Sequence, residues 1–188
     1  MAVAGHSGDL DRARVGLTDE AATVRSTALG ALDRLGVLTP DELVAGVRDP
    51  EPAVRRRAAE LAAGRPAVSI EGLLEDADAS VVEMTAWALG ERGEVGAVPR
   101  LVTLSALTGG HDDPLVREAA IAALGAIGDA AGLPAVLAAL DDKPAIRRRA
   151  AVALAAFEGP EVDAALHRCL EDRDWQVRQV AEDLLAES

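Results

Sequence analysis

One phrase occurs six times along the chain and limits what it can fold into. An aliphatic residue is followed four positions later by a small residue, usually Ala, and at seven and eight positions by further apolar residues. The aliphatic residues that open the six copies are spaced by 27 to 35 positions; they are Val24, Val54, Val81, Val116, Ile146 and Val177. A unit of this size cannot bury its apolar face alone, so the copies are predicted to stack on one another.

Each copy is predicted to contain two helices. Counted from the opening residue, positions 0, +4, +7, +8 and +11 lie on one face of an α-helix. Three copies have a proline two positions before the opening residue, where it suits a first helical turn, and three have a glycine at +12, where a left-handed residue ends a helix: Pro52, Pro114, Pro144, Gly36, Gly93 and Gly128. Shorter apolar stretches supply the first helices, over residues 10–17, 40–47, 68–74, 98–107, 133–140 and 162–170.

The predicted fold is therefore all-α, a right-handed α-solenoid (an α–α superhelix) of about six helix pairs. It is expected to form a single array over residues 8–188 after a flexible tail at residues 1–7. Composition agrees with close helix packing, because 49% of the residues are apolar but only 2% are aromatic, so that Ala, Leu and Val must fill the core.

Charge and composition also exclude several classes of protein. The formal net charge of −13 argues against a surface that neutralises phosphates, so no nucleic acid partner is expected. No apolar run approaches the length of a transmembrane helix and no signal peptide is recognisable, so the chain is expected to be cytoplasmic and without a membrane partner.

Acidic and basic residues recur at fixed places in the copies. Asp stands five positions before the opening residue in five copies, and Arg directly follows it in five; these residues are Asp19, Asp49, Asp76, Asp141, Asp172, Arg25, Arg55, Arg117, Arg147 and Arg178. The pattern Asp-x4-Val-Arg-x2-Ala-x2-Ala-Leu-Gly resembles HEAT repeats of the short type also found in phycobilisome lyases, over about residues 8–188. The resemblance implies that Asp and Arg form a ladder of charge-assisted bonds between neighbouring copies.

For function the resemblance leaves several classes open, since the family includes scaffolds, lyase subunits, DNA glycosylases and a hydroxylase. None of the three histidines precedes a Glu, as a diiron hydroxylase requires, and there is no GxSxG motif or phosphate-binding glycine loop. Cys169 shares a helix with His167 and is interpreted as a core residue. No cofactor and no metal are therefore expected. A glycosylase could use Trp87 and Trp175, but the acidic charge and the absence of Tyr argue against it.

The second helices of a solenoid line its concave face, so their outward positions form the candidate binding surface. It includes Ser26, Thr27, Gly30 and Arg34 in copy one. The residues expected to contact a partner are Arg56, Arg57, Met84, Trp87, Leu115, Arg148, Arg149, Val152 and Trp175. Trp87, at +6, is interpreted either as packed against a neighbouring helix or as a contact anchor. Trp175, at −2, is interpreted as packing beside its own first helix or as a contact.

The repeat pattern breaks near Trp87, on both sides of it. Val82 replaces the ladder arginine, His111 replaces the ladder aspartate, and residues 108–112 resemble a loop insertion. Such departures indicate either a functional site or drift within the repeats. The resulting hypothesis is a non-enzymatic scaffold or adaptor that binds a protein or peptide, whose acidic groups would meet the paired arginines. The alternative is an enzyme or enzyme subunit, either a lyase-type factor or a DNA glycosylase.

Overall fold

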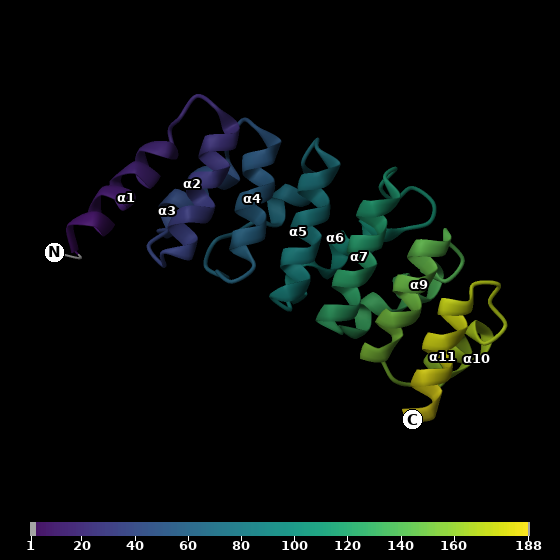
Figure 1. Cartoon of the computed structure of the whole chain (residues 1–188). Helices are drawn as coiled ribbons and strands as arrows, with labels where there is room; N and C mark the ends of the chain where they lie inside the picture. The colour runs from purple at the N-terminus through teal and green to yellow at the C-terminus, as the bar shows by residue number, and fades with distance from the viewer. Residues whose placement is uncertain (1–2, 188) are drawn as a thin grey trace. The chain divides into compact units, whose positions relative to one another are not determined.

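The computed structural model describes residues 3–187, which form helices joined by turns, with no strand among the described residues (Figure 1). Helix α1 (Val3–Gly16) begins inside the stretch that was expected to be a flexible tail, while residues 1–2 of that stretch lie outside the described residues. The chain divides into two compact units, residues 1–88 and 89–188, and the division falls within helix α5 (Ala79–Glu91).

Unit 1 consists of two complete helix pairs and the larger part of α5. Its helices are α1, α2 (Ala22–Arg34), α3 (Pro40–Val47) and α4 (Pro52–Ala62). Helix α1 packs against α2 and α3 against α4, and the second helices α2 and α4 pack side by side. Leu29, Leu32 and Leu43 are almost completely buried between them.

The third copy departs from the predicted helix pair. Its first helix, expected over residues 68–74, is only a short 3-10 helix, η1 (Glu71–Glu75). The step from Val54 to Val81 is the shortest of the five, and Pro66 and Gly72 leave no stretch of good helix formers within it. Val68, Ile70 and Leu74 are nevertheless buried, so the segment fulfils the packing role of a helix without forming one.

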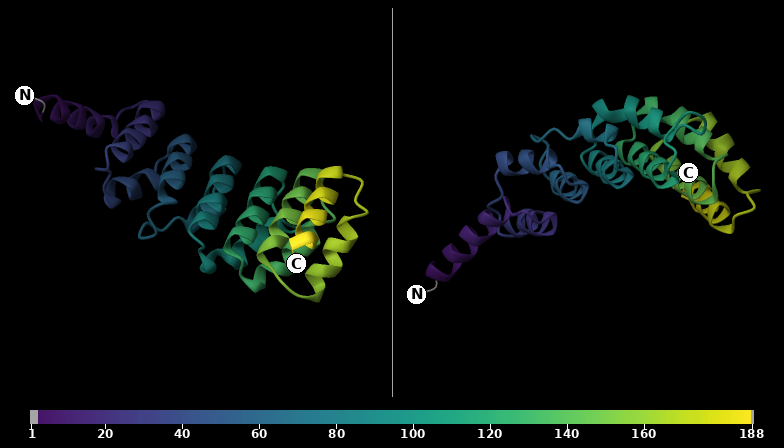
Figure 2. Two further views of the ribbon diagram at one scale, coloured as in Figure 1. Left: turned by 60° about the horizontal axis from the view of Figure 1, so that its bottom comes forward. Right: turned by 90° about the horizontal axis from the view of Figure 1, so that it is seen from above.

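Unit 2 consists of three helix pairs after the end of α5. The right-hand view of Figure 2 shows them in two rows. The elements are η2 (Val95–Ala97), α6 (Val98–Ser105), α7 (Pro114–Ile127), η3 (Ala130–Gly132), α8 (Leu133–Ala139), α9 (Pro144–Ala153), η4 (Leu154–Ala156), α10 (Pro160–Cys169) and α11 (Trp175–Glu187). Second helix packs on second helix, α7 on α9 and α9 on α11.

The helix ends follow the sequence signals. Pro52, Pro114 and Pro144 are the first residues of α4, α7 and α9. The +12 glycines have the expected left-handed backbone, with φ of 70° at Gly36, 60° at Gly93 and 68° at Gly128. These predictions are confirmed because proline and glycine act through local backbone geometry that packing does not override.

The opening residues of the copies are buried, with one exception. Val54, Val81, Val116, Ile146 and Val177 are at most 1% exposed, whereas Val24 is 41% exposed. Val24 lies against Gly16 of α1: a Cβ placed on Gly16 would be 3.6 Å from the Cγ1 of Val24. A glycine has no side chain with which to cover Val24 on that side.

Candidate partner-binding surface

Four arginines each form a two-pronged ion pair with an aspartate of the next copy. The paired nitrogen and oxygen atoms lie 2.7 and 2.8 Å apart for Arg25 and Asp49, 2.6 and 2.8 Å for Arg55 and Asp76, 3.1 and 3.3 Å for Arg117 and Asp142, and 3.0 and 3.1 Å for Arg147 and Asp172. Two pairs lie within unit 1 and two within unit 2. Such fork-shaped bonds fix the two groups in direction as well as distance.

Each of these arginines also secures the turn before its own helix. The Nη1 of Arg55, which takes no part in the pair with Asp76, donates to the carbonyl oxygens of Asp49 and Pro50 at 2.9 and 2.8 Å. The Asp49 carboxylate accepts the backbone N–H of Glu51 at 2.9 Å. One guanidinium therefore connects the turn of its own copy to the carboxylate of the next, and no buried side-chain nitrogen or oxygen among the described residues lacks a partner.

The ion pairs keep the aspartates charged. The hydrogen bonds from Arg25 and Arg55 hold the pKa of Asp49 and of Asp76 below the usual range, against the opposing effect of burial. At Asp142 burial is the largest influence and raises the pKa, but the bonds from Arg117 and from the Lys143 N–H outweigh it and the pKa is lowered.

The ladder residue of copy five is Asp142, not Asp141 as the spacing predicted. Asp141 is exposed, while Asp142 is 8% exposed and accepts both bonds from Arg117. Backbone turn bonds continue after α8 through Asp142, whose N–H donates to the carbonyl of Ala139. Only Lys143 then separates Asp142 from Pro144 at the start of α9, so the turn is one residue shorter than in the other copies.

Three further ladder positions carry no two-pronged pair. The carboxylate of Asp19, in the first copy, caps the N–H of Ala21, and Arg178, in the last copy, donates to the carbonyl of Asp172. At the break, His111 takes over part of the role of an aspartate, because its Nδ1 accepts the N–H of Asp113 at 3.1 Å and its carbonyl accepts from Arg117. His111 therefore stabilises the turn before α7 as a ladder aspartate would, but supplies no carboxylate for an arginine of the preceding copy.

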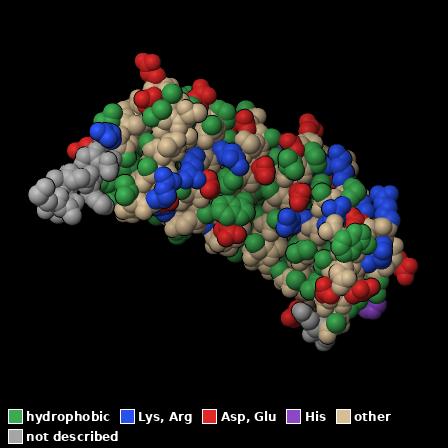
Figure 3. Space-filling view, viewed as in Figure 1, with side chains coloured by type: hydrophobic (Ala, Val, Ile, Leu, Met, Phe, Trp, Pro, Cys, Tyr) green, Lys and Arg blue, Asp and Glu red, His purple; other side chains and the backbone are tan. Residues whose placement is uncertain are grey.

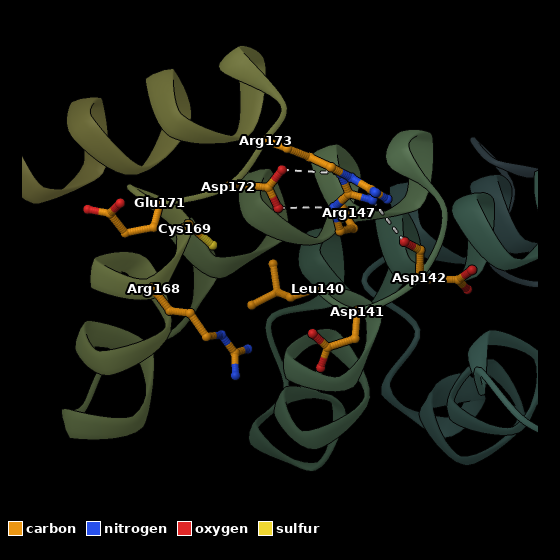
Figure 4. A pocket seen from close by; sticks show the side chains of 9 residues that line it. All are labelled: Leu140, Asp141, Asp142, Arg147, Arg168, Cys169, Glu171, Asp172 and Arg173. Atoms are coloured by element: carbon orange, nitrogen blue, oxygen red, sulfur yellow. Dashed lines mark hydrogen bonds and ion pairs between the residues drawn. The ribbon is translucent and has the colours of Figure 1, made fainter.

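A hollow of about 420 Å³ opens beside the last ladder pair of unit 2 (Figure 4). Figure 4 shows Arg147 bonded to Asp172 and to the backbone of Asp142, with Arg168 and Asp141 reaching into the lower part of the hollow from opposite sides. Its lining carries three arginines and four carboxylates, so the charges nearly cancel. Cys169 is 4% exposed, and burial raises the pKa of its thiol, which opposes nucleophilic use. This hollow belongs to the ladder.

The outer side of the second helices in unit 1 is basic. Arg56 and Arg57 line a hollow of about 380 Å³ together with Arg34, Ser26, Thr27, Ala53 and Glu60. Figure 3 shows Lys and Arg side chains gathered over α2 and α4 on this face. On α5, Met84 is half-buried and Trp87 is 42% exposed. A large part of the Trp87 side chain is therefore accessible to a partner.

The outer side of the second helices in unit 2 is more apolar. Leu115, Val152 and Trp175 are 57%, 49% and 64% exposed. Most of the Trp175 side chain is thus accessible to a partner. Val152 and Arg149 line a hollow of about 330 Å³ whose other walls are small residues: Ala122, Gly125, Ala126, Ala153, Ala155 and Ala156.

The two arginine pairs, which look alike in the sequence, have different surroundings. Arg148 bonds to Asp174 at 2.7 Å and Arg149 to Glu118 at 3.4 Å, so neighbouring copies neutralise both. Arg57 pairs with Glu60 at 2.7 Å, and Arg56 has no carboxylate partner among the described residues. Sequence reasoning missed these partners because they come from adjacent copies, at distances that the turn lengths decide.

No grouping of three or more His, Cys, Asp or Glu side chains in the described part of the chain could hold a metal ion. None of the helices described is long and apolar enough to cross a membrane.

The stacked helix pairs and the ladder define an α-solenoid of repeated units, and comparison with known proteins gives the family. A family model for HEAT repeats matches residues 66–152 and 102–186, about two thirds of the chain. The chain belongs to the HEAT-repeat family. No curated protein sequence matches it.

Several solved structures have the same fold. The complex of CpcE and CpcF of phycocyanin lyase from Nostoc sp. PCC7120 matches with a TM-score of 0.68 and 24% identity, over 94% of this chain and 75% of that one. A designed armadillo repeat protein in complex with the peptide (KR)4 matches with a TM-score of 0.69 and 18% identity, over 94% and 98%. An engineered protein matches with a TM-score of 0.69 and 20% identity, over 95% and 97%. At these identities the likeness shows the fold alone.

Proposed function

We propose that this chain is a non-enzymatic scaffold that binds a protein or peptide partner on the outer sides of its second helices. The observation that carries the proposal is the exposure of large apolar side chains at those positions: Trp87 in unit 1, and Leu115, Val152 and Trp175 in unit 2. Exposed tryptophan is costly for a free protein and frequent among residues that dominate binding.

The fold supports the same function. Stacked helix pairs hold their outward side chains on a rigid surface, so little conformational entropy is lost when a partner binds. Two of the similar structures are themselves complexes, one of CpcE with CpcF and one with the peptide (KR)4. We extend from them only the general mode, a solenoid that contacts a protein or peptide.

The chemistry of the two faces indicates the kind of partner. The arginine-lined hollow of unit 1 favours carboxylates, although the chain as a whole is strongly acidic. The small-residue hollow beside Val152 in unit 2 favours an apolar side chain. The proposed partner therefore carries an acidic segment and apolar anchors.

A selection of displayed peptides on the purified full chain tests the proposal. We expect Trp87→Ala to weaken binding of the selected peptides by about 2 kcal/mol, the range of buried aromatic anchors, with the far-ultraviolet circular dichroism unchanged. Val95→Ala is the matched control, because Val95 is 55% exposed but lies in η2 and not on a second helix. Fluorescence anisotropy gives the dissociation constants.

The proposal fails if no peptide is selected, or if the selected peptides bind Trp87→Ala and Trp175→Ala as tightly as the wild type. Turnover of a small substrate at a rate that the second-helix substitutions do not change would favour the enzyme-subunit alternative instead.

A further inference from the structure

The hollow between α2 and α4 differs from the other hollows in charge. It is lined by three arginines and one glutamate, with Ser26, Thr27 and Ala53 completing its walls. The guanidinium of Arg57 is 2.7 Å from the carboxylate of Glu60, which balances one positive charge. Arg34 and Arg56 are exposed, and neither forms an ion pair with any residue that the structure describes. The hollow therefore carries a net charge of about +2 within a chain of −13.

A glycine gives Arg57 its place. Gly30 lies in the interior of α2 and is buried, and a Cβ added to it would collide with the Arg57 guanidinium. Glycine is unfavourable in the middle of a helix, so the position works against the stability of α2. The space left by the missing side chain of Gly30 is occupied by the planar guanidinium of Arg57, whose orientation is also fixed by its ion pair with Glu60. A donor that is already placed loses little freedom when an anion binds.

The remaining walls leave the charge uncompensated. The hydroxyl groups of Ser26 and Thr27 donate to the carbonyl of Thr23, at 3.1 and 2.7 Å, and add no charge. In unit 2 the arginines of the corresponding helix, Arg148 and Arg149, have carboxylates from neighbouring copies. The basic hollow of unit 1 is thus specific to α2 and α4.

We propose that this hollow binds a doubly charged oxyanion displayed on a peptide, either two adjacent carboxylates or one phosphoryl group. Guanidinium groups bind both through paired N–H donors, and a charge of −2 matches the net charge of the hollow. The volume of about 380 Å³ accommodates side chains rather than a bare ion. The inference rests on the proposed function, because it assigns the acidic part of the proposed partner to one place.

The test follows the arginine side-chain Nε–H signals of the ¹⁵N-labelled full chain by NMR. Four probes are titrated: the capped dipeptide Glu-Glu, capped phosphoserine, the capped dipeptide Ala-Ala, and a single-stranded oligonucleotide. We expect saturable shifts of Arg34, Arg56 and Arg57 with the first two probes only. The larger affinity of the two then identifies the source of the oxyanion. The exposed Arg48, at the end of α3 and outside the hollow, should not shift.

Two variants separate the site from a general charge effect. Arg56→Gln should weaken binding about tenfold, the cost of one charge-assisted contact, whereas the matched Arg48→Gln should not change it. Gly30→Ala should weaken binding several-fold with all charges retained, because only the position of Arg57 changes. The proposal is overturned if all exposed arginines shift alike, if Gly30→Ala binds as the wild type, or if the oligonucleotide binds more tightly than the acidic probes.

The outcome is distinguishable from failure of the proposed function. If the selected peptides depend on Trp87 but compete with neither acidic probe, the scaffold function is supported and the anion site is contradicted. Saturable binding of an acidic probe in a chain that selects no peptide would do the reverse.

Discussion

At the scale of single residues, the ladder arginines are expected to contribute more to stability than surface ion pairs do. The side chains of Arg117 and Asp142 are 10% and 4% exposed, and Arg117 also serves the carbonyls of His111 and Asp112. Removing one partner of a buried pair leaves a charge without compensation. We expect Arg117→Ala to lower the free energy of unfolding by about 3 kcal/mol, measured by urea denaturation.

The control for this substitution is Arg48→Ala, which removes an arginine from an exposed position without a ladder role. The urea midpoint of Arg48→Ala should stay close to that of the wild type. Equal midpoints for the two variants would mean that the Arg117 pair contributes no more than a solvated charge.

The same pairs predict a dependence of stability on pH. The pKa of Asp49 and of Asp76 is lowered in the folded chain, chiefly by the hydrogen bonds from Arg25 and Arg55, while an unfolded aspartate titrates near about 3.9. Their contribution is therefore complete above about pH 4 and is lost as the pH falls through the lower folded values. Urea midpoints of wild type and Asp76→Asn should differ at pH 7, and the difference should shrink as the pH falls below the value for an unfolded aspartate, about 3.9. A difference that does not change with pH contradicts the assignment.

The ladder also shows what the sequence could predict at this scale. Repetition alone places Arg25, Arg55, Arg117 and Arg147 correctly, because they lie at a fixed position of a regular helix. It misplaces one aspartate, since Asp141 and Asp142 are adjacent and the length of the turn before Pro144 decides between them. The exposure of Trp87 and the pairing of Arg148 with Asp174 depend on the packing of neighbouring copies, which no spacing within a copy contains.

At the scale of elements, substitution of two glycines in second helices is expected to have opposite effects on stability. A Cβ at Gly125 of α7 would stand 2.6 Å from the Cβ and 2.9 Å from the Cα of Ala153, so α9 would have to move. At Gly30 the nearest atoms to an added Cβ belong to the flexible end of Arg57. We expect Gly125→Ala to destabilise the chain by about 1–3 kcal/mol by overpacking, and Gly30→Ala to be neutral or stabilising, since alanine favours helix by about 1 kcal/mol.

Thermal denaturation followed by circular dichroism compares the two variants. A higher midpoint for Gly125→Ala than for Gly30→Ala would mean that α7 and α9 are not in close contact at that point. The sequence predicts the element type of every second helix, but not that of the first element of copy three. Val68, Ile70 and Leu74 are apolar whether their segment forms an α-helix or a 3-10 turn.

At the scale of the whole molecule, stability is expected to be the sum of units and their nearest-neighbour interfaces. A chain that ends at Gly159 lacks α10 and α11, whose contacts within unit 2 include the packing of α11 on α9 and the bond of Asp172 to Arg147. The shorter chain should retain its helix content per residue, because the remaining pairs keep their own neighbours. It should be less stable and less soluble, because the side of α9 that packs on α11 becomes exposed. Circular dichroism and sedimentation velocity measure both effects, and complete loss of helix would show that stability is shared beyond adjacent pairs.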